Sequence, residues 1–137
     1  MKKSQPIGEW IPFAEGKYLA ERALLVSAND KGIELENTVI EVSEDRGRQR
    51  RLRGRGRSEP ALMVNLLDDG DELDLLLDFG GEFKYRMRRP EIQSGKVFAP
   101  GVKSVIQFFP QQPWEQVPEA EFSSLVTRIR IFGRKKD

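Results

Sequence analysis

The stretch that decides the fold is residues 73–87, Leu-Asp-Leu-Leu-Leu-Asp-Phe-Gly-Gly-Glu-Phe-Lys-Tyr-Arg-Met. Apolar and charged side chains alternate on both sides of the two glycines, and a period of two is typical of half-buried antiparallel strands. A two-residue loop would pair Asp78 with Phe83 and mix polar with apolar side chains on one face. A three-residue loop at 80–82 instead pairs Phe79 with Phe83 and keeps the faces separate. The stretch therefore predicts a β-hairpin.

The residues before this hairpin extend it to a predicted three-stranded meander over residues 61–88. Leu62, Val64 and Leu66 alternate with Met63, Asn65 and Leu67. A four-residue loop at 68–71 then pairs Leu66 with Leu73, Val64 with Leu75 and Leu62 with Leu77. On the outer face, the hairpin register places Asp78 opposite Lys84 and Asp74 opposite Arg88. Cross-strand ion pairs of this kind contribute about 0.2–1 kcal/mol each.

The rest of the chain also favours short strands. Further strands are expected at residues 32–42, 102–109 and 125–132, and a single helical turn at 118–122. Residues 17–28 fit a helix by composition but favour a strand, because a tight turn and a strand follow them. We therefore expect one all-β domain over residues 1–137. It is an antiparallel β-sandwich, jelly-roll-like, or a barrel, with at most one short helix.

The composition excludes several classes of enzyme. The chain has 137 residues and contains no cysteine and no histidine. Disulfides, thiolate nucleophiles, cysteine-bound metal sites and Ser-His-Asp hydrolases are therefore excluded. The glycine spacings match neither the phosphate-binding loop nor the dinucleotide fingerprint. We expect a protein that is not an enzyme and that has no cofactor and no metal site.

An acidic run at residues 68–72, Asp-Asp-Gly-Asp-Glu, supplies the oxygen ligands that calcium or magnesium prefers. Its spacing does not match the calcium loop with glutamate at position 12. A solvated turn is the favoured interpretation of this run.

The sharpest functional feature is an arginine-rich window at residues 46–57. It contains seven arginines, Arg46, Arg48, Arg50, Arg51, Arg53, Arg55 and Arg57, with three glycines between them and no acidic residue. The whole chain has a net charge of +1, so the other residues together carry −6 (1 − 7). Interleaved glycines and the length of the window predict a flexible loop.

Guanidinium groups bind phosphates bidentately, so the loop predicts a non-catalytic binding module that contacts a polyanion, most favourably nucleic acid. Trp10 and Trp114 are candidate stacking residues. One alternative is an assembly or scaffold protein in which the loop docks on an acidic protein surface, including that of a second copy. The loop could also cover the chain's own acidic residues between 68 and 78.

A weaker alternative comes from a resemblance near the end of the chain. Residues 114–133 follow the order W-x-x-V-P-x-x-x-F-x-x-L-x-x-x-I-x-I-F-G. This order resembles the closing strands of galactose-binding-like jelly-roll modules. The resemblance covers about 20 residues, and it implies a β-sandwich and binding of carbohydrate.

No targeting signal or membrane-spanning stretch is evident. The basic start at residues 1–3 is followed by polar residues, and no apolar run approaches the roughly 20 residues that a transmembrane helix needs. We therefore expect a cytoplasmic protein that does not enter a membrane.

Overall fold

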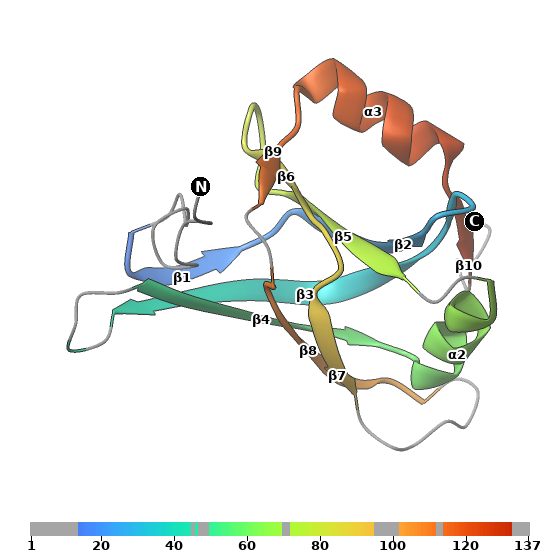
Figure 1. Cartoon of the computed structure of the whole chain (residues 1–137), viewed down its shortest axis with the longest axis horizontal. Helices are drawn as coiled ribbons and strands as arrows, with labels where there is room; N and C mark the ends of the chain where they lie inside the picture. Colours follow the sequence, from blue (N-terminus) through green and yellow to red (C-terminus); the bar gives the residue numbers. More distant parts are fainter. Residues whose placement is uncertain are drawn as a thin grey trace, which may run out of the picture.

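The computed structural model describes residues 14–44, 46, 50–69, 72–94, 102–111 and 114–132, and within these ranges most residues belong to strands. Ten strands form one largely antiparallel sheet that curls into a half-barrel, with two short helices packed on it (Figure 1). The strands are β1 (Gly16–Leu19), β2 (Arg22–Ser27), β3 (Lys31–Glu44), β4 (Arg50–Ser58), β5 (Leu73–Asp78), β6 (Lys84–Met87), β7 (Glu91–Ser94), β8 (Ser104–Phe109), β9 (Glu115–Gln116) and β10 (Arg130–Phe132), and the helices are α2 (Pro60–Asp69) and α3 (Glu119–Arg128). The expected β architecture is confirmed in this coarse form, although the described chain has two helices where at most one was expected.

The long strand β3 organises the sheet, because each of its edges pairs with two other strands. One edge pairs with β2 and then β1, and the other pairs in parallel with β10 and then antiparallel with β4. The register shifts between Glu36 and Val39, and Asn37 there has a φ of 51°. This bulge bends β3 where its partners change. The main path through the sheet is β7-β8-β4-β3-β2-β5-β6-β9.

The strands expected at 17–28, 32–42 and 102–109 are confirmed. The first of these is two strands, β1 and β2, separated by Ala20 and Glu21. β2 and β3 form the expected hairpin, in which Val26 pairs with Gly32. Asp30 in the turn has a φ of 60°, a conformation that aspartate tolerates better than most residues.

The β5–β6 hairpin forms in the register that its sequence predicts. Leu75 pairs with Met87, Leu77 with Tyr85 and Asp78 with Lys84. The Phe79 amide donates to the Phe83 carbonyl at 2.8 Å and closes the loop. Lys84 Nζ lies 3.2 Å from the Asp78 carboxylate, as expected.

Asp74 has a different principal partner from the one expected. Arg86 donates two hydrogen bonds to Asp74 Oδ2, at 2.8 and 3.0 Å, whereas the Arg88 guanidinium lies 3.8 Å from that oxygen. Arg88 instead donates to Glu115 on β9. The outer face of the hairpin therefore carries a network of ion pairs rather than the two separate pairs that were expected.

The first strand of the predicted meander, within residues 61–67, is wrong, because residues 60–69 form helix α2. Pro60 starts the helix at a position where its missing N–H costs nothing, and the following Ala, Leu and Met are strong helix formers. Met63 and Leu66, three residues apart, are buried in the core, while Val64 is 43% exposed. β5 therefore takes β2 as its second neighbour, pairing Leu75 with Leu25 and Leu77 with Ala23.

The strand expected at 125–132 is also largely wrong. Helix α3 continues to Arg128, and only Arg130–Phe132 form a strand, β10. Four apolar side chains on one face of α3 and just beyond it explain this: Phe122, Leu125, Val126 and Ile129 all pack against Leu24, Val26 and Leu76. Their spacing of three, four and seven residues is that of an amphipathic helix. A helix within residues 114–133 departs from the strands that the jelly-roll resemblance implies.

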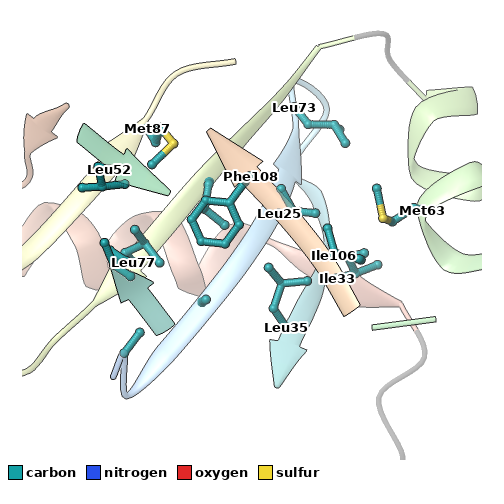
Figure 2. Close-up of a cluster of buried hydrophobic side chains, with 14 of the residues drawn as sticks. Leu25, Ile33, Leu35, Leu52, Met63, Leu73, Leu77, Met87, Ile106 and Phe108 are labelled. Atoms are coloured by element: carbon teal, nitrogen blue, oxygen red, sulfur yellow. The ribbon is translucent and has the colours of Figure 1, made fainter. Parts of the chain in front are cut away.

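The main hydrophobic core fills the inside of the curled sheet. It draws on β2, β3, β4, β5, β6 and β8 and on α2, and Figure 2 shows Phe108 among Leu25, Leu52, Leu77, Met87 and Ile106. Phe108 is only 1% exposed. A second, smaller cluster lies between α3 and the outer side of β2 and β5 (Figure 1). The outer side of the sheet is thus covered by a helix at β2 and β5.

Candidate nucleic-acid interface

The arginine-rich window is not a flexible loop over most of its length, which corrects the prediction for residues 46–57. Arg50–Ser58 form strand β4, which pairs with β3 on one edge and with β8 on the other. Arg46 lies in an exposed turn before the strand, and Arg48 and the side chain of Arg50 lie outside the described residues. Arg55 and Arg57 therefore stand on a part of β4 that has a partner strand on both edges, whereas Arg51 and Arg53 are paired with β3 on one edge only in the described structure.

Alternation along β4 separates its arginines from its small residues. Arg51, Arg53, Arg55 and Arg57 are exposed, whereas Leu52, Gly54, Gly56 and Ser58 are buried. Side chains two residues apart on a strand point to the same face and recur about every 6.6–6.8 Å. The four exposed guanidinium groups thus form one row, which we call the arginine ladder.

The glycines of β4 serve close packing rather than flexibility. A Cβ atom at Gly54 would lie 2.1 Å from two ring carbons of Phe108, and one at Gly56 would lie 2.7 Å from Thr38 Oγ1. Glycine lets the buried Phe108 ring approach the backbone of β4 directly. The Arg-Gly repeat therefore encodes a strand with arginine outside and no side chain inside.

The strands beside β4 add polar and apolar side chains to the same outer face. Arg55 pairs with Val39 on β3 and with Gln107 on β8, and Arg57 pairs with Glu36 and with Val105 in the same two strands. Val105 is 50% exposed, and Leu19, which pairs with Val39 from β1, is 67% exposed. The ladder is thus bordered by apolar side chains that contact solvent.

One end of the ladder is neutralised by an acidic residue of β3. Arg53 donates two hydrogen bonds to Glu41 Oε1, at 2.8 and 3.0 Å, and Lys17 Nζ lies 3.6 Å from the same carboxylate. The hydrogen bond from Arg53, with the positive charges of Arg53, Lys17 and Arg55, holds the pKa of Glu41 below its ordinary value. Glu41 is therefore ionised at neutral pH and occupies the Arg53 guanidinium.

The other end of the ladder is more open. Glu36, opposite Arg57, accepts a hydrogen bond of 2.8 Å from Lys103. That bond is the main cause that lowers the pKa of Glu36, and the Arg57 charge adds to it. Among the described residues, neither Arg55 nor Arg57 has a carboxylate within the 4 Å of an ion pair. These two arginines have their positive charge available to an external anion.

The acidic residues of the β5–β6 hairpin do not contact the ladder. Asp74 and Asp78 are held by Arg86 and Lys84 of the same hairpin. β3 and β2 lie between β4 and β5 in the sheet. The side chains of Asp68 and Asp69, and all of Asp71, lie outside the described residues. The sequence left open that the arginines pack against the chain's own acidic residues between 68 and 78. The two described aspartates, Asp74 and Asp78, do not make this contact.

Of the two tryptophans, only Trp114 is within the described residues, and it does not join the ladder. Trp114 packs half-buried against the core beside β6, with its ring centroid 5.7 Å from that of Tyr85. This placement is that of a packing residue, and its predicted stacking role has no observation to support it. Trp10 lies outside the described residues.

Side chains that sequence reasoning missed complete the face. Lys17 and Lys103 add positive charge beside the ladder, and Gln107 and Phe109 lie on the outer face of β8. These residues are distant from the arginines in sequence, and only the pairing of β1, β4 and β8 brings them together. The one signal of these side chains in the sequence was the alternation of inward-facing and outward-facing residues within 104–109.

No three acidic side chains converge as ligands of a metal ion within the described ranges. Neither described helix is long and apolar enough to cross a membrane. Comparison of the chain with protein-family models, with curated proteins and with solved structures returns no match.

Proposed function

We propose that this chain is a non-catalytic binding module that contacts the phosphates of a nucleic acid through the arginine ladder of β4. The observation that carries the proposal is the row Arg51, Arg53, Arg55 and Arg57, exposed on one face of a strand that pairs with β3 and, from Gly54 to Ser58, also with β8. A fixed row of guanidinium groups is suited to a linear polyanion, because the backbone holding the donors is already ordered before binding.

The surroundings of the ladder also favour nucleic acid. Arg53 and Lys17 share the single carboxylate of Glu41, so a net positive charge remains there. Lys103 holds Glu36 beside Arg57, and exposed Leu19 and Val105 offer apolar surface to bases. The outer face of β2 and β5 is covered by α3, whereas no described helix covers the outer face of β4. The ladder is therefore accessible with respect to the described part of the chain.

Salt dependence tests the proposal. We expect a fluorescein-labelled single-stranded oligonucleotide of mixed sequence to bind at low salt, as measured by fluorescence anisotropy. If four phosphates are contacted, the logarithm of the association constant should fall with the logarithm of the salt concentration with a slope of about −2.8. If each of the four phosphates is contacted only part of the time, the slope is shallower but still negative.

The alternatives give different results in the same experiment. If the protein does not bind the oligonucleotide but forms a discrete oligomer in light scattering, and salt weakens this oligomer, the proposal is contradicted. That result would favour docking on an acidic protein surface. Binding of a sugar that is insensitive to salt and changes tryptophan fluorescence would favour the carbohydrate-binding jelly-roll alternative.

A further inference from the structure

The arginine ladder is not uniform, and this bears on what it binds. Arg53 is held by Glu41, whereas Arg55 and Arg57 have no ion pair with a described residue. A phosphate that binds the Nε–Nη2 edge of Arg53 has to displace a carboxylate that already accepts two hydrogen bonds, and one that binds elsewhere on this guanidinium is repelled by that carboxylate. A phosphate that binds Arg55 or Arg57 displaces only water, so binding there costs less free energy.

The neighbours of the open half suit unpaired bases. Arg55 has Gln107 on one side and Val39 on the other. Arg57 has the half-exposed Val105 on one side and Glu36, which Lys103 holds, on the other. An amide side chain offers both a donor and an acceptor to base edges. Aliphatic side chains and guanidinium planes offer surfaces on which a base can lie flat. A duplex keeps its bases stacked inside and presents mainly phosphates to such a surface.

The curvature of the sheet also favours a single strand over a duplex. The core lies inside the half-barrel, so the ladder stands on the outer, convex side of the sheet (Figure 1). A duplex is stiff, with a persistence length of about 150 base pairs, and touches a convex surface over a short length only. A single strand is flexible and can follow the direction of β4 from one arginine to the next.

We infer that Arg55 and Arg57 form the main phosphate subsite for a single-stranded nucleic acid, whose bases lie toward Gln107 and Val105. Arg53 is a reserve site that Glu41 occupies in the free protein. This inference rests on the proposed function, because it assumes that the ladder binds nucleic acid, and it adds which half of the ladder binds and which form of nucleic acid is preferred.

Two matched double variants test which half of the ladder binds. Arg55→Gln with Arg57→Gln removes the open pair, and we expect it to weaken binding of a labelled single strand at least about tenfold. Arg51→Gln with Arg53→Gln removes the same two positive charges from the other half of the ladder, so the two variants are matched in net charge. We expect this second variant to lose clearly less affinity than the first, about threefold, because Arg53 is already paired with Glu41.

The outcomes separate the inference from the proposed function. Equal losses for the two double variants would overturn the assignment of the open half, while binding itself would still support the proposed function. Tighter binding of a duplex of the same sequence than of the single strand would overturn the preference for single strands. Absence of binding to either oligonucleotide at low salt would overturn both. Urea unfolding of each variant excludes loss of the fold as the cause of a weaker affinity.

Discussion

Replacing Gly54 with alanine should destabilise the protein by about 2–3 kcal/mol. The new Cβ would lie 2.1 Å from two ring carbons of Phe108, which is 1% exposed and cannot move outward without disturbing the core. Overpacking a dense interior forces side chains from their preferred rotamers or shifts the backbone. Urea unfolding followed by circular dichroism measures the change in the free energy of unfolding.

The sign of this effect distinguishes a strand from a flexible loop. In a mobile Arg/Gly loop, glycine to alanine would be neutral or would stabilise the protein by about 0.4–1 kcal/mol, because it restricts the unfolded chain. Arg55→Ala, at the next position and on the exposed face, is the control and should stay within about 1 kcal/mol. Combining Gly54→Ala with Phe108→Ala should cost less than the sum of the two single changes, because the clash is then absent. A stabilising Gly54→Ala would contradict the packing described here.

Removing the whole ladder should abolish most of the affinity for nucleic acid. The variant in which Arg51, Arg53, Arg55 and Arg57 are all replaced by glutamine should bind a labelled single strand at least about 100-fold more weakly at low salt. The four side chains are exposed, so their removal should leave the core intact. Fluorescence anisotropy measures the affinity, and a urea unfolding curve checks that the variant is folded.

A variant with the same change in charge elsewhere is the control for this loss. Replacement of Lys31, Arg89, Arg128 and Arg130 by glutamine also removes four positive charges, outside the outer face of β4. Long-range attraction depends on the total charge, whereas contacts depend on position. We expect this variant to lose no more than about fivefold in affinity. Comparable losses in both variants would mean that net charge, and not the ladder, accounts for binding.

Local side-chain patterns predicted the parts of the fold in which polar and apolar residues clearly alternate. The β5–β6 hairpin formed with its expected loop, since only one register separates Asp78 and Lys84 from Leu77 and Tyr85. Residues 61–67 carry little such contrast, because every residue there except Asn65 is apolar. Helix propensity and Pro60 then decided the structure, and the segment folded as α2.

The two other wrong predictions concern residues 125–132 and strand β4. In both segments the sequence contained signs of the observed structure that the alternation of large side chains concealed. Phe122, Leu125, Val126 and Ile129 follow the spacing of a helix face, but Leu125, Ile129 and Ile131 fit a strand as well. In β4, the buried positions are Leu52, Gly54, Gly56 and Ser58, so Leu52 is the single large apolar side chain that could reveal the alternation. The arginines themselves were predicted as the binding residues, but their common face and the roles of Glu41 and Lys103 depend on long-range strand pairing, which sequence spacing alone does not supply.

Amide hydrogen exchange of the free protein tests whether the arginine-rich segment is an ordered strand. Residues 54–58 of β4 lie between β3 and β8, so their amides are within the hydrogen-bonded sheet. Such amides exchange only when the sheet opens. We expect the amides of residues 54–57 to be protected to the same degree as those of residues 39–42 in β3. Exchange of residues 54–57 at the rate of an unstructured peptide, with residues 39–42 still protected, would contradict the placement of β4 in the sheet.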